Sequence, residues 1–328
     1  MKRRTMLAVA GATGLAGMLP ARAQSALNWT LYHHQSAPQF TTSVGAKRFA
    51  DGIESLTDGA IKVRLHLAGT LQINSANLTT AVSQNVVTLG DDFFFAGNIP
   101  IAALVRLPFL ATTYEEFAKV SAVMQPYVDR AYDSKGVVVL ASYAYPNQFI
   151  WSRKEITSLA GLKGAKIRVA SPEQGEFMRR FGATPVTIGP SEVPSALDRG
   201  VVDGLVTGTV GADLWQDMLR FGYLMGLNFN NSYLIANAGA YRKLNADLQG
   251  KVRKAAVDAA RWNEDTMRAD DGTLVQKLGA AKLKIATPSS AEIEQASGAI
   301  RGYWDEWAKQ RGGEAPEILT RVRQTLGR

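Results

Sequence analysis

The 328-residue chain contains no cysteine and only three histidines. Without cysteine it can form no disulfide bond, no thiolate metal site and no thiol nucleophile. Two of the histidines, His33 and His34, are adjacent in sequence and therefore lack the spacing at which one face of an element presents two metal ligands. The chain also lacks the G-x-S-x-G and H-E-x-x-H motifs of hydrolases. We therefore expect no enzymatic activity, no metal site and no cofactor.

Charge and hydropathy exclude two further classes of protein. Basic side chains outnumber acidic ones by 37 to 29, but they form no arginine-rich stripe interleaved with aromatic residues. Such a stripe would mark a nucleic-acid interface, so we predict no nucleic-acid partner. After residue 23 no apolar run approaches 18 residues, the length that suggests a membrane-spanning helix. The mature protein is therefore not expected to be embedded in a membrane.

The first 23 residues have the pattern of an export signal. A basic start that includes Arg3 and Arg4 precedes an apolar run over residues 6–18, and Ala21-Arg22-Ala23 fits the small-x-small cleavage pattern. The arginine pair also resembles a twin-arginine signal, so the Sec and twin-arginine routes both remain open. Either route predicts a periplasmic protein.

The next part of the chain has an alternating strand–helix pattern. Period-two apolar residues predict strands at 27–31, 61–67 and 86–92, and helical spacing predicts helices at 40–56 and 78–85. This order is typical of a doubly wound α/β unit.

A second unit of similar layout follows. Strands are predicted at 166–170, 185–188 and 201–206, with helices starting at Ser171 and covering 191–199. Ser171, Pro172 and Gln174 form a good helix start with a capping box. Two such units argue for two lobes rather than one large sheet.

The last part of the chain is mostly helical. Apolar spacing predicts one long helix over 245–278, with a bend at Asp270-Asp271-Gly272. A strand at 282–286 and a final helix at 291–308 follow. A helix that long would run across both lobes.

A ligand site can be predicted from the strand ends. In open α/β sheets, ligands bind outside the carboxyl ends of the strands. Arg168 ends an otherwise apolar strand, and its guanidinium can make two parallel hydrogen bonds to a carboxylate. The alternative is an arginine that pairs with a surface acid. Weaker candidates, each also explained as a turn, strand-end or core residue, are Gln35, Asp92, Phe93, Gln148, Thr207 and Trp215.

Several of these residues lie in segments that resemble a known family. Residues 159–169, LAGLKGAKIRV, resemble the DLKGLKIRV signature of the DctP-type substrate-binding proteins of TRAP transporters. GVVDG at 200–204, EVPSAL at 192–197, LPFL at 107–110 and YPNQ at 145–148 resemble further motifs of the family. The matches follow the family's order between residues 27 and about 310.

The resemblance implies a periplasmic binding protein fold of type II, with hinge strands between two lobes and a long helix crossing both. It implies closure on a small organic acid and delivery to the permease subunits of a TRAP transporter. The family's carboxylate-clamping arginine falls on Arg168. A second arginine of some members falls near Gln148, and Thr207 stands where many have asparagine. Tyr145 then joins Phe93 and Trp215 near the expected site.

From these features we place lobe I at residues 24–145 plus about 233–272, and lobe II at 146–232 plus about 273–328. Three other functions remain open on the sequence. A binding protein of an ABC-type importer would share the two lobes but lack the long crossing helix. A ligand-sensing subunit would share the whole pattern, and an exported hydrolase is disfavoured by the missing motifs.

The leader generates a first testable prediction. Mass spectrometry of the periplasmic fraction of an expressing cell should show a chain that begins at or near Gln24. A membrane-retained chain that still carries residues 1–23 would contradict the predicted cleavage.

Overall fold

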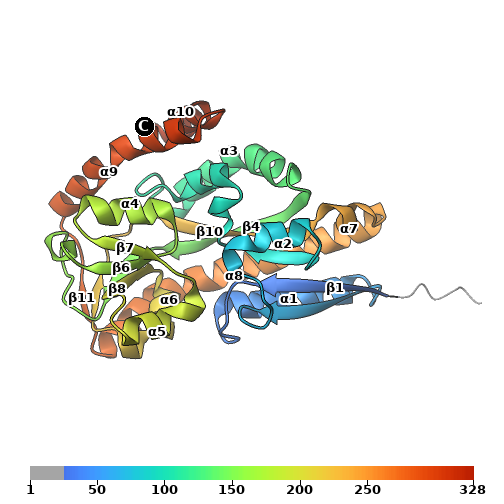
Figure 1. The fold of residues 1–328 in the computed structure, drawn as a ribbon, viewed down its shortest axis with the longest axis horizontal. Helices are drawn as coiled ribbons and strands as arrows, with labels where there is room; N and C mark the ends of the chain where they lie inside the picture. Colours follow the sequence, from blue (N-terminus) through green and yellow to red (C-terminus); the bar gives the residue numbers. More distant parts are fainter. Residues whose placement is uncertain (1–25) are drawn as a thin grey trace, which may run out of the picture.

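The computed structural model describes residues 26–328 (Figure 1). The predicted leader at residues 1–23 lies outside this range, so its cleavage and its export route stay predictions. The described chain folds around two separate sheets, each covered by helices. This arrangement confirms the predicted two-lobe α/β fold.

The first sheet lies mainly in the N-terminal half of the chain. It is formed by β1 (Leu27–His33), β2 (Ile61–Leu67), β3 (Leu89–Asp92), β4 (Val137–Asn147) and β10 (Phe229–Asn237), in the spatial order β2-β1-β3-β10-β4. Strand β1 pairs in parallel with β2 and β3, whereas β10 is antiparallel to β3 and β4. The carboxyl ends of the three parallel strands therefore meet at one edge.

The second sheet lies mainly in the central part of the chain. It is formed by β5 (Phe149–Ser152), β6 (Lys166–Val169), β7 (Thr184–Thr187), β8 (Gly204–Thr207), β9 (Phe221–Tyr223) and β11 (Lys284–Ala286), in the order β11-β9-β5-β8-β6-β7. Strand β6 is parallel to β7 and β8. This sheet thus also gathers three parallel carboxyl ends at one edge.

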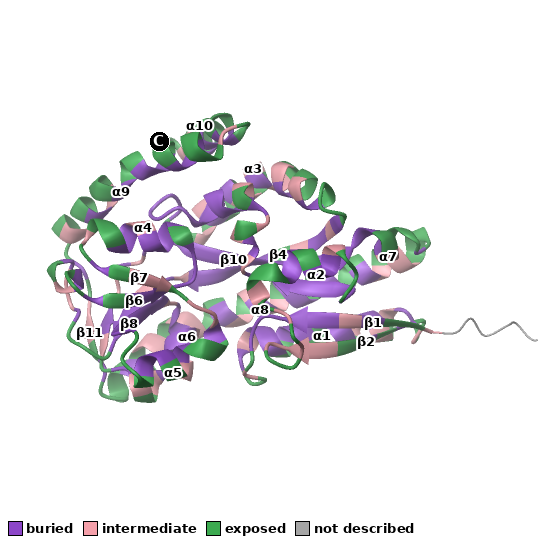
Figure 2. Cartoon of the chain, viewed as in Figure 1, coloured by how far each residue is buried: buried purple, intermediate pink, exposed green. Residues whose placement is uncertain are grey.

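Helices surround both sheets. The α-helices are α1 (Thr41–Leu56), α2 (Leu78–Ser83), α3 (Tyr114–Asp133), α4 (Pro172–Arg180), α5 (Val193–Asp198), α6 (Thr209–Leu214), α7 (Ala238–Arg242), α8 (Ala246–Ala280), α9 (Ser290–Arg311) and α10 (Ala315–Leu326). Short 3-10 turns are η1 (Ser75–Asn77), η2 (Phe95–Gly97), η3 (Pro100–Arg106), η4 (Ala160–Leu162), η5 (Pro190–Glu192) and η6 (Gln216–Met218). Figure 2 shows the strands largely buried and the outer faces of α9 and α10 exposed.

The chain passes between the two sheets at closely spaced points. Strand β4 ends at Asn147 and β5 begins at Phe149, so only Gln148 separates a strand of one sheet from a strand of the other. The return path runs from β9 to β10 through residues 224–228, where Leu227 N donates to the Gln148 carbonyl at 2.8 Å. The two crossings are therefore hydrogen-bonded to each other, as expected of hinge segments.

The long helix α8 bridges the two halves of the molecule. In its first half it packs closely against α1, since a Cβ built on Gly52 would lie 3.3 Å from that of Ala255. Near its end it reaches α6, where Thr209 Oγ1 donates to Asp271 at 2.6 Å. The helix continues through the predicted bend at residues 270–272. It spans both halves, as the sequence predicts.

The joint between the halves has a shared apolar core. The rings of Phe109 and Phe177 lie 5.9 Å apart, and Trp304 Nε1 donates to the Pro108 carbonyl at 2.9 Å. Phe109 has a φ of 58°, in the left-handed region that bulky residues avoid. Its N–H donates to Leu227 at 2.8 Å and its carbonyl accepts from Arg328 at 3.2 Å. These bonds hold the LPFL segment in its strained conformation.

Two strand starts differ from the prediction. Strand β3 begins at Leu89 rather than at residue 86, because Asn85 has a positive φ and Val86 remains 60% exposed in a turn. Strand β8 begins at Gly204 rather than at residue 201, because Gly200 has a φ of 66° and the following residues complete a turn. The apolar side chains of these turns extended the alternating pattern beyond the strands.

The predicted capping of α4 is largely present. Ser171 Oγ accepts from Gln174 N at 3.3 Å. The Gln174 side chain accepts from the Ala170 N–H at 2.9 Å rather than from that of Ser171. The reciprocal bond therefore falls one residue earlier than in a standard capping box.

The predicted lobe boundaries can be compared with the sheets but stay a prediction. Strand β10 crosses the boundary near residue 233 and belongs over its whole length to the first sheet. Helix α10, assigned to lobe II, packs against α3 beside the first sheet. Among residues 26–328, no helix combines the length and apolar character needed to cross a membrane.

The packing of β8 on β5 generates a stability prediction. A Cβ at Gly204 would lie 2.5 Å from the Trp151 carbonyl oxygen, which is backbone and cannot move aside. Gly204→Ala should therefore lower the free energy of unfolding by about 1–3 kcal/mol, as measured by urea titration. The matched control is Gly250→Ala in α8, where nothing lies within 4 Å. It should raise stability by roughly 0.5–1 kcal/mol. Equal effects of the two changes would contradict the proposed close contact.

Candidate ligand-binding site

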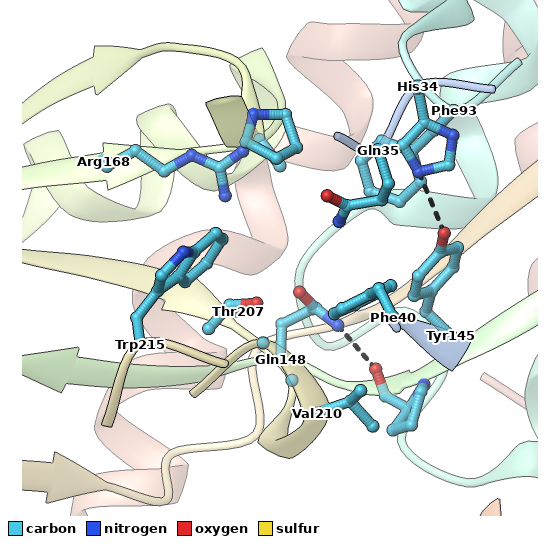
Figure 3. Close-up of a pocket in the computed structure, with 15 residues that line it drawn as sticks. His34, Gln35, Phe40, Phe93, Tyr145, Gln148, Arg168, Thr207, Val210 and Trp215 are labelled. Atoms are coloured by element: carbon cyan, nitrogen blue, oxygen red, sulfur yellow. Dashed lines mark hydrogen bonds between the residues drawn. The ribbon is translucent and has the colours of Figure 1, made fainter. Parts of the chain in front are cut away.

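A cavity lies between the two sheets (Figure 3). Its volume is about 40 Å³, which exceeds the roughly 10–15 Å³ that one water molecule needs. The lining residues are His34, Gln35, Phe40, Phe93, Tyr145, Pro146, Gln148, Arg168, Ala170, Pro190, Thr207, Gly208, Val210, Gly211 and Trp215. The cavity is therefore bounded by strand ends of both sheets, as the rule for open α/β sheets predicts.

A second hollow of about 400 Å³ adjoins the cavity and shares Pro190 with it. It is lined by the segment after β2, including Ala68 and Gly69, and by the segment after β7, including Ile188 and Gly189. The carboxyl ends of β1, β2, β3, β6, β7 and β8 thus all border one of the two hollows.

The structure brings seven of the eight predicted site residues together. Gln35, Phe93, Tyr145, Gln148, Arg168, Thr207 and Trp215 line the cavity. The eighth, Asp92, does not line it. Residues not singled out beforehand include His34 and Phe40 on one side, and Pro190 and Val210 on the other.

Asp92 is placed away from the cavity by the alternation of its strand. Successive side chains of a strand point to opposite faces, and the neighbouring Asp91 points toward His33 and His34. The Asp92 carboxylate accepts from Thr79 at 2.5 Å and from Tyr132 at 3.2 Å. Burial raises its pKa to about 7. The prediction of Asp92 as a ligand contact is therefore wrong.

Arg168 enters the cavity from the end of β6. Its Nε donates to the Ile188 carbonyl at 3.0 Å, and its Nη1 lies 3.4 Å from the Val206 carbonyl. Within residues 26–328 it forms no ion pair, although it is only 4% exposed. Burial lowers its pKa to about 10, while the charge of Glu192 acts in the opposite direction. The guanidinium thus stays charged at neutral pH and is held by neutral carbonyl groups from the two neighbouring strands.

Gln148 lies in the crossing between the sheets and turns its side chain to the cavity. Its Nε2 donates to the Pro146 carbonyl at 2.7 Å. Figure 3 shows its amide oxygen directed into the cavity, with Gln35 on the wall opposite Arg168. Thr207 is held beside Gly211, since a Cβ at Gly211 would lie 2.1 Å from the Thr207 Oγ1. These residues offer uncharged hydrogen-bonding groups.

Aromatic rings form much of the wall on the side of the first sheet. The Phe93 ring is stacked on His34 at 5.1 Å between ring centres and meets Tyr145 edge-on at 4.9 Å. The Arg106 guanidinium lies over the Phe93 ring, 4.6 Å from the ring centre, and Arg106 does not line the cavity. Trp215 supplies an aromatic surface on the side of the second sheet. The cavity can therefore hold a compact ligand body between apolar faces.

His34 is the main residue that sequence reasoning missed. Its Nδ1 lies 3.2 Å from the Asp91 carbonyl oxygen, and its Nε2 lies 3.1 Å from the Tyr145 hydroxyl. Burial lowers its pKa to about 3, and the neighbouring His33 acts in the same direction. His34 is thus a neutral member of the wall. Its position directly after β1, at a predicted strand end, is the sequence feature that could have identified it as a site residue.

A buried cluster of His33, His34 and Asp91 lies behind this wall, with candidate metal-ligating atoms within 4.8 Å of one another. His33 Nδ1 is 2.9 Å from Asp91 Oδ2. The same carboxylate accepts from Tyr143 at 2.8 Å and from Ser232. Tyr143 and Ser232 thus supply hydrogen-bond partners for the carboxylate, and we interpret the cluster as a polar network that supports the wall.

Comparison with known proteins places the chain in a family. The family model described as bacterial extracellular solute-binding protein, family 7 (DctP), matches residues 32–310. The chain belongs to this family. The match confirms the resemblance drawn from the sequence motifs, and the family consists of solute-binding receptors.

Relatives in the DctP family cover most of the chain. The C4-dicarboxylate-binding periplasmic protein DctP of Rhodobacter capsulatus is 23% identical, over 93% of this chain and 92% of its own length. A monocarboxylate 2-oxoacid-binding periplasmic protein of Nostoc is 25% identical, over 78% of this chain and 72% of its own length.

Solved structures share the fold. DctP7 of Bordetella pertussis, a receptor binding pyroglutamic acid, has a TM-score of 0.84 and 24% identity, covering 91% of this chain and 100% of its own. A TRAP solute-binding protein of Sulfurospirillum deleyianum with bound succinate has a TM-score of 0.82 and 20% identity, covering 91% and 99%.

The environment of Asp92 generates a prediction on pH dependence. Its folded-state pKa, about 7, lies above the ordinary value of 3.8. Its contribution to stability is therefore fully present below the ordinary value and is lost as the pH rises through 7. Over that window, wild type should lose stability relative to Asp92→Asn by at most about 1.4 kcal/mol per pH unit.

Urea titrations across the same pH range measure this difference. The matched control is Asp198→Asn, which changes an exposed carboxylate at the end of α5. Its difference from wild type should not vary with pH in the same way. Parallel curves for wild type and Asp92→Asn would show that the pKa of Asp92 is not raised in the folded protein.

Proposed function

We propose that this protein is a periplasmic receptor that binds a small organic carboxylate and delivers it to the permease of a TRAP transporter. Membership in the DctP family supports the receptor role. The observation that carries the ligand class is Arg168, a buried guanidinium that faces a cavity and forms no ion pair among residues 26–328.

The chemistry of Arg168 favours a carboxylate over a neutral ligand. A buried charge without a counter-charge is costly, and an anion that pairs with it removes much of that cost. A guanidinium matches a carboxylate through two parallel charge-assisted hydrogen bonds. Both carbonyl contacts of Arg168 come from the protein side, at Ile188 and Val206. The remaining amino group, Nη2, is available to a ligand.

The two-lobed fold supports a capture mechanism. Sheet edges from both halves border the cavity, and the hinge segments meet beside it at Gln148. Closure of the halves over a ligand would bury the anion between them. A closed receptor then presents a distinct shape to a permease. Uptake of the acid by vesicles that contain the permease, dependent on added receptor, tests the delivery step.

Arg168→Ala is the decisive variant for the ligand class. Removing one partner of a buried charged pair costs roughly 3–5 kcal/mol, so affinity should fall by about two orders of magnitude or more, at about 1.4 kcal/mol per tenfold. Arg168→Lys should recover only part of the loss, since an ammonium keeps the charge but not the planar fork.

The measurement begins with a thermal-shift screen of organic acids on the mature protein, followed by calorimetry with the tightest acid. Arg199→Ala, an exposed arginine after α5, is the matched control and should bind as wild type does. The acid should be recovered chemically unchanged after incubation. Binding by folded Arg168→Ala within about threefold of wild type would place the anchor elsewhere, and turnover of the acid would contradict a receptor role.

A further inference from the structure

We propose that the cavity selects organic acids with one negative charge and rejects dicarboxylates, and that Gln148 and the His34–Tyr145 pair are the groups that exclude the second charge. This inference rests on the proposed function, because it takes Arg168 as the anchor of the ligand carboxylate. It concerns what lies opposite that anchor.

The first argument is the count of charges around the cavity. Arg168 is the one lining residue with a permanent charge. A ligand with one carboxylate therefore leaves the closed cavity electrically balanced. A second carboxylate would be buried without a counter-charge, which costs several kcal/mol per ion even after the surroundings relax.

The second argument is the orientation of the Gln148 amide. Its Nε2 is used by the Pro146 carbonyl at 2.7 Å, so the group that it presents to the cavity is the oxygen (Figure 3). An amide oxygen accepts hydrogen bonds and repels a carboxylate. Gln148 thus suits a hydroxyl, an amide N–H or another donor on the ligand body, and disfavours a second anionic oxygen.

The third argument is the direction of the hydrogen bonds in the wall. The Asp91 carbonyl can only accept, so His34 Nδ1, 3.2 Å away, carries the hydrogen and Nε2 is the acceptor. The Tyr145 hydroxyl has two acceptors within the wall, His34 Nε2 at 3.1 Å and Thr42 Oγ1 at 3.3 Å. The hydrogen of Tyr145 is therefore committed within the wall and is not offered to a ligand anion.

The fourth argument concerns the other buried cation nearby, Arg106. Its Nε donates to Asn231 at 3.0 Å and its Nη2 to the Phe93 carbonyl at 2.8 Å. The Phe93 ring stacks against its guanidinium at 4.6 Å, and Arg106 does not line the cavity. Its Nη1 has no hydrogen-bond partner within residues 26–328, but this atom is buried outside the cavity lining and is not presented to a ligand there. Arg168 is thus the one arginine that the cavity lining offers to a ligand.

Matched acids that differ only in their second charge test the inference. Succinate and succinamate have the same length and shape, as do glutarate and glutaramate, but each amide has lost one carboxylate charge. Calorimetry at about pH 8, well above the ordinary carboxyl pKa of about 4, compares the members of each pair. We expect the mono-amide to bind at least about tenfold more tightly than its diacid.

A charge-adding variant should shift the preference. Gln35 faces Arg168 across the cavity. Gln35→Arg should bring a second cation to the cavity and favour the diacid over the amide. Gln35→Met is the matched control, since it has a similar length and no charge, and should keep the wild-type order. Gln148→Arg serves as a second charge-adding variant if Gln35→Arg does not fold.

The outcomes separate this inference from the proposed function. A diacid that binds wild type as tightly as its mono-amide, or a dicarboxylate as the tightest acid of the wider screen, overturns the single-charge rule and leaves the carboxylate receptor intact. If Gln35→Met no longer prefers the mono-amide to the diacid, the amide of Gln35, and not the charge balance, sets the preference. If no organic acid binds at all, the proposed function fails and this inference fails with it.

Discussion

Arg168 carries a positive charge into the space between the two sheets, where its protein partners are the carbonyl groups of Ile188 and Val206. Those carbonyls belong to the ends of β7 and β8, the two neighbours of β6, so the strand order itself builds the support for the guanidinium. Carbonyl dipoles orient the charge but do not neutralise it. The ligand-free cavity therefore holds an unbalanced charge that an anion can balance, and this constraint decides what the surrounding residues have to be.

The opposite wall meets that constraint by keeping its own charges away from the cavity. Asp91 lies behind the wall, where His33, Tyr143 and Ser232 surround its carboxylate. Burial acts to raise the pKa of Asp91, but the charge and the hydrogen bond of His33 outweigh it and hold the pKa below the ordinary value. An unscreened carboxylate at this position would repel the anion that we propose Arg168 to bind. The network turns the acidic strand end into a neutral surface of His34, Phe93 and Tyr145.

The parts of the structure that were predictable from sequence were those with a short-range signal. The strand–helix alternation, the cap at Ser171 and the place of Arg168 at a strand end all follow from local patterns. Asp92 was assigned to the site because its position at a strand end does not show that its side chain turns to Thr79 and Tyr132, which come from other elements of the fold. Strand β10 was not predicted at all. It contains Asn231 and Ser232, yet both side chains are buried, and their hydrogen-bond partners, Arg106 and Asp91, come from distant segments that a local pattern cannot show.

Gln148 is at once a wall of the cavity and the single residue between β4 and β5. A substitution there alters the group that a ligand meets and the torsion angles of a crossing strand in the same step. Thr207 and Trp215 lie at the end of β8 and after α6, so neither is part of the crossing between the sheets. New side chains can therefore be introduced most freely on the second sheet, whereas a change at the crossing must also preserve the path of the backbone between the sheets. The path of the backbone thus limits which positions of the site can change without affecting the crossing.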